Sequence, residues 1–108
     1  MICEMRVYRC LPGRLPNLLK RFENHTLKIW DKHGIRQAGF FTTLIGQSNQ
    51  ELTYFLSWES LAEREQKWTA FMNDPAWLSV RSESEKDGQI VENIFSQILA
   101  PTAFSAVK

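Results

Sequence analysis

Features that tie a chain to a metal, a membrane or an oxidising compartment are scarce in this sequence. Its 108 residues include only two cysteines, and Cys3 and Cys10 fall on one predicted strand. Seven residues of strand span about 23 Å, whereas a disulfide needs Cα atoms within about 7 Å, so the two cannot pair. No secretory signal and no run of 18 apolar residues are evident. We therefore expect a cytoplasmic protein without a membrane contact.

Sequence motifs for catalysis and cofactor binding are also missing. The chain has no phosphate loop, no CxxC, HExxH or GxSxG motif and no paired-carboxylate signature. His25 and His33 are eight residues apart on one predicted helix, about 12 Å along its axis, which is too far for a shared metal. We expect neither a metal nor a cofactor.

The charge is nearly balanced, at +1 overall, which leaves no strong field for nucleic acid. The first fifty residues carry eight Lys or Arg and three Asp or Glu, and the remainder carry five and nine. This asymmetry can orient two copies of the chain against each other, although solvated faces explain it equally well. We expect residues 1–100 to form a single domain, and the tail at 101–108 to be loosely held or packed on a partner.

What the chain does contain is an alternation of strand and helix signals. Strand-forming residues at 2–11 end at a Pro-Gly turn, and apolar residues at helical spacing over 15–32 stop at Gly34. Strand signals return at 35–46, with a bend expected at Gly39, and at 51–58, so these two segments predict a hairpin around the polar turn 47–50.

The second half of the chain repeats this alternation. Ser60 and Glu63 form a capping box in which each side chain bonds the other's amide, which starts a helix to about residue 73. Asp74 and Pro75 start a further short helix, with Trp77, Leu78 and Val80 as its expected anchors. Polar residues 81–88 predict an exposed connection, and residues 89–99 predict a last strand.

The resulting β-α-β-β-α-β order predicts an α+β, ferredoxin-like fold, in which both helices cover one face of an antiparallel four-stranded sheet. The strands are apolar on both sides, however. In the last one, Ile90, Ile94 and Ile98 alternate with Val91, Phe95 and Leu99. Because a bare apolar face is unusual in a monomer, we expect a homodimer through this sheet face. The alternative is that the last segment is partly helical.

Two residues are candidates for catalysis. His25 lies at the edge of the apolar face of the first helix, either as a packed histidine or as an acid–base group at the mouth of a pocket between helix and sheet. Arg64 lies four residues before Trp68 on the second helix, so the pair can bind a carboxylate or a planar ring. The alternative is that the Arg stem covers the indole.

Further residues are candidates for binding a ligand, although core packing or turn formation also explains most of them. Glu92 stands out in an apolar strand, where it can pair with Arg6 or Arg9 or face a wet cavity as a base with a raised pKa. Together with Trp68, the candidate ligand-binding residues are Tyr8, Thr43, Asn49, Trp58, Glu92 and Asn93.

Short motifs follow one another along most of the chain in a characteristic order. They are Tyr8 before Pro12-Gly13, Phe22, His25, His33-Gly34-Ile35, Gly39-Phe40-Phe41-Thr42-Thr43, Ile45-Gly46, Asn49, Trp58, Leu61, Arg64, Asp74-Pro75, Trp77 and Glu92-Asn93. In this order and spacing, from about Met5 to Pro101, the chain resembles the NIPSNAP family. Such proteins look like members of the dimeric α/β-barrel superfamily, which includes cofactor-free monooxygenases, haem-degrading enzymes and lactone isomerases. The resemblance implies a dimeric barrel with a cavity between sheet and helices, but no particular reaction.

Two functions are compatible with these features. The first is an enzyme, such as a cofactor-independent monooxygenase or isomerase, that holds a small apolar or aromatic compound oriented by His25, Arg64 and Asn49. The second is a non-catalytic module for small-molecule binding or protein interaction, which the absence of a catalytic motif favours. Nucleic-acid binding is a weaker alternative, because the open sheet face is expected to be used by the dimer.

Overall fold

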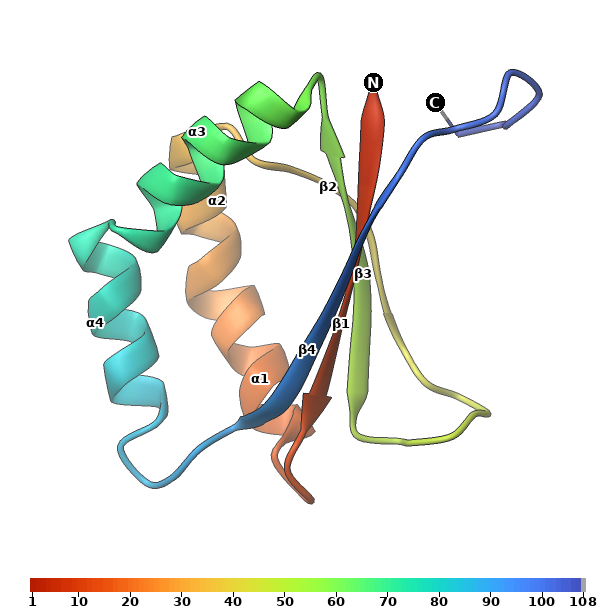
Figure 1. Cartoon of the computed structure of the whole chain (residues 1–108). Helices are drawn as coiled ribbons and strands as arrows, with labels where there is room; N and C mark the ends of the chain where they lie inside the picture. Colours follow the sequence, from red (N-terminus) through yellow and green to blue (C-terminus); the bar gives the residue numbers. More distant parts are fainter. Residues whose placement is uncertain (108) are drawn as a thin grey trace.

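The computed structural model describes residues 1–107 and has the ferredoxin-like α+β fold that the sequence predicts. All helices lie on one side of a four-stranded antiparallel sheet whose strand order is β2-β3-β1-β4 (Figure 1). The elements are β1 (Ile2–Cys10), α1 (Leu15–Arg21), a π-helical turn η1 (Phe22–Thr26), α2 (Leu27–His33), β2 (Arg36–Thr42), β3 (Glu51–Trp58), α3 (Leu61–Met72), α4 (Pro75–Ser84) and β4 (Val91–Leu99).

β1 is central to the sheet, because it pairs with β3 on one side and β4 on the other. Glu4 lies opposite Leu56 and Ile98, and Arg6 lies opposite Tyr54 and Ser96. Since side chains alternate along a strand, the even-numbered residues of β1 from Glu4 to Cys10 are the buried ones and face the helices. This register brings charged residues into the interior of the domain.

The first helix covers the predicted range and ends at Gly34, whose φ of 69° is the left-handed conformation that favours glycine. It is interrupted by η1, where the Thr26 hydroxyl donates to the carbonyl oxygen of Arg21. The apolar spacing of the sequence did not reveal this π-helical turn. Such turns occur frequently at functional sites.

Three local predictions need correction. The Ser60 hydroxyl accepts from the Glu63 amide as predicted, but the Glu63 carboxylate accepts from the amide of Glu59 rather than that of Ser60. α4 continues to Ser84, so the first half of the predicted polar connection is helical. Leu78 is 42% exposed and is not an anchor of α4.

The hairpin between β2 and β3 forms, with the predicted bend at Gly39, where the pairing register shifts. β2 ends at Thr42, earlier than the predicted strand, because the following residues leave the sheet. Leu44 and Ile45 are each 95% exposed in the loop that results.

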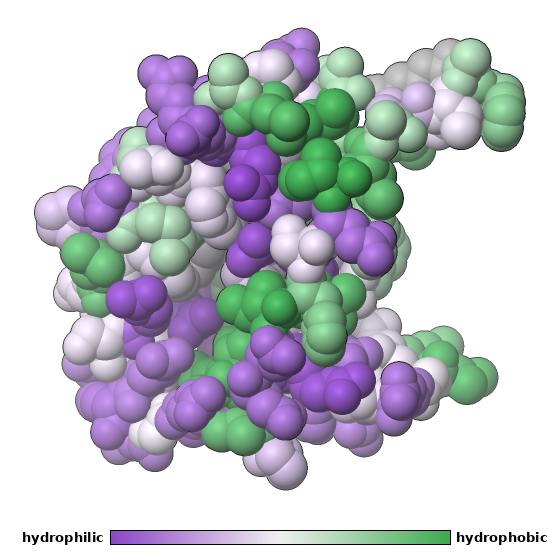
Figure 2. Space-filling view, in the orientation of Figure 1, coloured by the Kyte–Doolittle hydropathy of each residue, from purple (hydrophilic) through white to green (hydrophobic). Residues whose placement is uncertain are grey.

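The sheet face opposite the helices carries exposed apolar side chains. β4 is a strand over Val91–Leu99, which excludes the helical alternative for this segment. The β2–β3 loop and the C-terminal tail both project on the bare side of the sheet (Figures 1 and 2). In the tail, predicted for residues 101–108, Phe104 is 90% exposed, and residue 108 lies outside the described range. Over residues 1–107, no helix has the length and apolar character needed to cross a bilayer.

Candidate functional site

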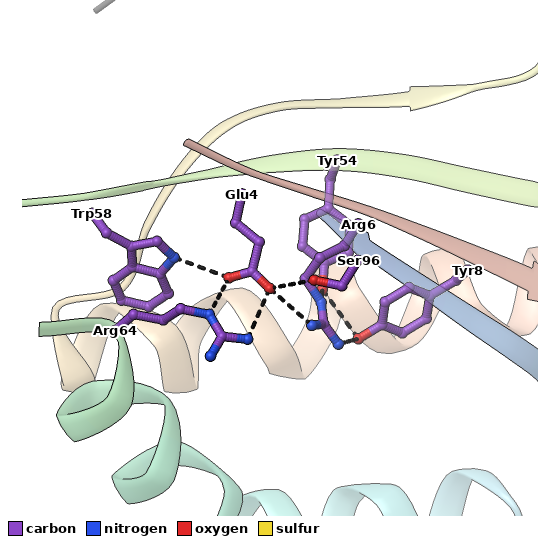
Figure 3. Close-up of polar contacts among 7 residues, drawn as sticks. All are labelled: Glu4, Arg6, Tyr8, Tyr54, Trp58, Arg64 and Ser96. Carbon is purple, nitrogen blue, oxygen red and sulfur yellow. Dashed lines mark hydrogen bonds and ion pairs between the residues drawn. The ribbon is translucent and has the colours of Figure 1, made fainter. Parts of the chain in front are cut away.

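A buried carboxylate lies at the centre of the helix-covered face of the sheet. Glu4 is completely buried, and its two oxygens accept five hydrogen bonds from three strands and one helix (Figure 3). Arg64 of α3 donates two of them, from Nε at 2.7 Å and from a terminal nitrogen at 3.0 Å. The other donors are Trp58 Nε1 at 3.0 Å, Ser96 Oγ at 2.7 Å and Arg6 at 3.2 Å.

These bonds keep Glu4 ionised. Burial alone would raise the pKa of its carboxyl, but the bonds from Arg64, Ser96 and Trp58 outweigh burial and lower that pKa to about 2. A carboxylate buried in this way is stable only when its oxygens are fully hydrogen-bonded. Glu4 therefore acts as a fixed anion that orients the two guanidinium groups around it.

Arg6 extends the cluster toward two tyrosines. Its Nε donates to the Tyr54 hydroxyl at 2.8 Å, a terminal nitrogen donates to the Tyr8 hydroxyl at 3.3 Å, and the two hydroxyls are 3.0 Å apart. The guanidinium group is also close to the Trp68 ring, 4.6 Å from its centroid. Arg6 thus connects the buried carboxylate to the phenolic groups.

One hydroxyl hydrogen of the tyrosine pair is left without an acceptor. Each hydroxyl accepts from Arg6, and the single bond between them uses the hydrogen of one of the two. In this bond the hydroxyl of the fully buried Tyr54 donates to that of Tyr8. Among the side chains within residues 1–107, the hydrogen of Tyr8 then has no acceptor.

A cavity of about 150 Å³ adjoins this cluster between the sheet and the helices. Aromatic side chains are the largest group in its wall, and the π-helical turn contributes to it. The lining residues are Arg6, Tyr8, Arg21, Phe22, Thr26, Trp30, Trp68, Phe71, Met72, Trp77, Arg81, Glu85, Val91 and Ile94.

Four residues predicted from the sequence to be functional meet at this place. Tyr8 and Trp68 line the cavity, whereas Trp58 and Arg64 hold Glu4. The Arg64 guanidinium does bind a carboxylate, as its position suggested, but the carboxylate belongs to the chain itself.

The remaining predicted residues lie elsewhere. His25 is exposed and lines a surface groove of about 380 Å³ between the first helix and α4, which shares Arg21 with the cavity but does not include the tyrosines. Thr43 and Asn49 belong to the β2–β3 loop, and Glu92 and Asn93 are exposed on β4.

Of the two alternatives for Glu92, the ion pair with Arg6 or Arg9 does not form among the described residues, and both arginines have other partners. Arg9 pairs with Glu51 at 2.8 Å, and Arg6 pairs with Glu4 at 3.2 Å. Over the described residues, no three His, Cys, Asp or Glu side chains are grouped so that they could hold a metal ion.

Glu4, Ser96, Tyr54 and Arg21 were not identified as site residues from the sequence. A signal for Glu4 was present, because Glu4, Arg6 and Tyr8 occupy alternate positions of one strand and must share a face. Two opposite charges on the same face as a tyrosine indicate either a solvated surface or a buried ionic cluster. Only the tertiary structure distinguishes these two cases.

The fold and this site define a ferredoxin-like α+β protein with an ionic cluster beside a cavity between sheet and helices. The family model NIPSNAP matches residues 3–106, so the chain belongs to the NIPSNAP family. No curated protein matches the sequence.

Solved structures of similar proteins agree with this assignment. A NIPSNAP family protein of unknown function from Agrobacterium tumefaciens is 30% identical, with a TM-score of 0.87 over 100% of this chain and 94% of that one. An uncharacterised NIPSNAP domain protein from Burkholderia xenovorans is 26% identical, with a TM-score of 0.84 over 97% and 98% of the two chains. A proposed antibiotic biosynthesis monooxygenase of Nitrosomonas europaea shares the fold alone, at 8% identity and a TM-score of 0.64 over 94% and 98%.

Replacement of Glu4 by Gln should destabilise the fold in a pH-dependent way. Because the folded-state pKa of Glu4 is about 2, below its ordinary value of 4.5, its stabilising effect is present above about pH 4.5 and is lost as the pH falls toward 2. We expect Glu4→Gln to lower the free energy of unfolding by about 3 kcal/mol at pH 7, and by much less near pH 2. Urea unfolding of both proteins across this pH range measures the difference.

Glu51→Gln is the matched control, because it removes the half-exposed ion pair with Arg9 on the other face of β1. It should cost less than about 1 kcal/mol at pH 7. Equal losses for the two variants would show that the buried cluster contributes no more than a surface ion pair.

Proposed function

We propose that this NIPSNAP protein binds a compact apolar or aromatic compound in the cavity beside the ionic cluster and acts on it without a cofactor. The observation that carries this proposal is the Tyr8 hydroxyl. It is polarised by Arg6, it lines the cavity, and its hydrogen has no acceptor among the described side chains. A carbonyl, enolate or phenolate oxygen of a bound compound supplies that acceptor.

The size and wall of the cavity select the compound. A cavity of about 150 Å³ is at the scale that holds one benzene-sized ring, below the range usual for drug-sized ligands. Trp30, Trp68, Phe71 and Trp77 offer ring faces and edges for offset or edge-to-face contacts. A single-ring compound fits these walls better than an extended chain.

Chemistry through an enolate suits the polar groups of the wall. A hydroxyl donor backed by a fixed guanidinium stabilises negative charge that develops on an oxygen in a site shielded from water. Glu85 is the one carboxylate on the described wall and can accept a proton from a bound compound. Cofactor-independent isomerisation of a carbonyl compound can proceed through such an anion, and so can monooxygenation when O2 is the oxidant and the substrate anion itself supplies the electrons.

A non-catalytic binding module is the second candidate. Glu4, the most buried acid, is committed to five hydrogen bonds, and His25 lies outside the cavity. If compounds bind in the cavity and are recovered unchanged, the binding module describes the protein and the enzyme does not.

The proposal includes a homodimer formed through the bare sheet face. An apolar groove of about 560 Å³ lies on this face, lined in part by Cys3, Phe41, Phe55 and Leu99. The β2–β3 loop and the tail project beyond the bare face (Figure 2), and their apolar tips are almost fully exposed. A second copy of the chain covers the groove and gives both projections a surface to pack on.

The binding proposal predicts that a single-ring ketone stabilises the protein through Tyr8. We expect acetophenone to bind and Tyr8→Phe to weaken it about five- to tenfold, because one hydrogen bond is lost. Toluene lacks the oxygen and should bind both proteins equally. Isothermal titration calorimetry compares the four pairs, and failure of both compounds to bind the wild-type protein would contradict the proposal.

The dimer proposal predicts that charge in the loop disrupts association. The wild-type protein should sediment as a dimer at micromolar concentration, and the double variant L44K/I45K should sediment mainly as a monomer. Leu61→Lys is the control, because Leu61 is an exposed apolar residue, 62% accessible, on the helix side. A wild-type monomer at micromolar concentration would refute the dimer.

A further inference from the structure

Side chains that carry an unpaired hydrogen-bond donor gather around the cavity. Within residues 1–107, the buried side-chain atoms without a partner are Nε of Arg14 and Arg21 and Nε1 of Trp30 and Trp77. Three of these four residues line the cavity, and each of the three is more than nine-tenths buried. A buried donor without a partner costs about 1–3 kcal/mol, so this concentration at one cavity points to an occupant that brings acceptors.

The charged side chains of the wall also favour a ligand that brings acceptors, because most of them are positive. Arg6, Arg21 and Arg81 line the cavity, and Glu85 is the acid among the described lining residues. Behind the wall, the single charge of Glu4 is shared between Arg6 and Arg64. Positive charge is therefore in excess at the cavity, and an anionic occupant balances it.

Arg21 has a guanidinium group that is only partly hydrogen-bonded within the protein. Arg6 is held by Glu4 and the two tyrosines, whereas Arg21 donates to Ser84 at 3.3 Å and lies 3.7 Å from Glu85. Its Nε is unpaired, and its guanidinium lies 5.2 Å from the centroid of the Trp77 ring. It is adjacent to the π-helical turn, in which Phe22 and Thr26 also line the cavity.

We infer, building on the proposed cavity function, that the ligand is a single-ring aromatic compound with a carboxylate or equivalent oxyanion, which Arg21 binds while Trp30 and Trp77 contact the ring. A carboxylate has only acceptors, which matches lining side chains whose unpaired atoms are all donors. The ring occupies the aromatic part of the cavity, where one ring fits. A cationic or donor-rich compound of the same size leaves the donors unpaired and adds to the positive charge.

Benzoate, benzyl alcohol, benzylammonium and toluene are probes of one size that separate these properties. We expect benzoate to bind the wild-type protein about tenfold or more tightly than benzyl alcohol, and benzylammonium not to bind. In ¹⁵N–¹H spectra, the indole signals of Trp30 and Trp77 should move with benzoate, whereas that of Trp58, which donates to Glu4, should stay in place.

Arg21→Met should abolish the preference for benzoate and keep toluene binding, since it removes the charge and retains the length of the side chain. Arg14→Met is the matched control, because Arg14 also has an unpaired buried Nε but does not line the cavity. Arg81→Gln alters an exposed lining residue, so it tests the charge of the wall even if Arg21→Met does not fold, and it should weaken benzoate severalfold.

The outcomes separate this inference from the function on which it rests. Equal binding of benzoate and benzyl alcohol, or loss of benzoate binding in Arg14→Met alone, overturns the anionic ligand while leaving an apolar binding cavity intact. Failure of all four probes, toluene included, overturns the binding cavity itself together with the inference.

Discussion

The rest of the structure depends on the hydrogen bonding of one buried carboxylate. Glu4 sits on the central strand with no exposed surface, and an ionised carboxyl in that position is tolerable only when its oxygens are fully paired. Its five donors come from β1, β3, β4 and α3, so the same bonds that keep it charged also join the sheet to the helix layer. The hydrogen bonds of the polar interior therefore also hold the helix layer against the sheet.

Glu4 also orients the polar side chains beside the cavity. Arg6 is held between Glu4 and the two tyrosines, and this leaves Tyr8 as the hydroxyl that lines the cavity with a hydrogen to donate. Glu4 is one negative charge between two guanidinium groups, so the cluster stays cationic as a whole. In the proposed function, the cluster stabilises negative charge on a bound ligand, and the aromatic side chains of the wall contact its ring.

The fold was accessible from the sequence, because its signals are local. Gly34 ends the first helix, Asp74 and Pro75 begin α4, and alternating residues mark β3 within its true bounds. The site was accessible only in part. Arg64 and Trp68 were found as neighbours on one helix, but the partner of Arg64 is 60 residues away in the chain, a separation at which spacing carries no information.

Other features of the site depend on tertiary geometry. The π-helical turn adds no residue that breaks the apolar spacing, so the sequence pattern does not show it. His25 was a reasonable candidate by residue type, yet the register of the helix leaves it exposed on the outer surface. The sequence did indicate a sheet with two apolar faces. The structure adds that the β2–β3 loop and the C-terminal tail, with exposed apolar residues, project on the face that the helices leave bare.

The titration of Glu4 shows directly whether its carboxyl is a fixed buried anion. With a ¹³C label in the glutamate side chains, the carboxyl shift of Glu4 can be followed by NMR from neutral to acidic pH in the folded protein. We expect Glu4 to stay ionised through the range in which exposed glutamates take up protons, with a midpoint at about 2. A midpoint above its ordinary value of 4.5 would show that burial outweighs the five hydrogen bonds, and would contradict the role of Glu4 as a fixed buried anion.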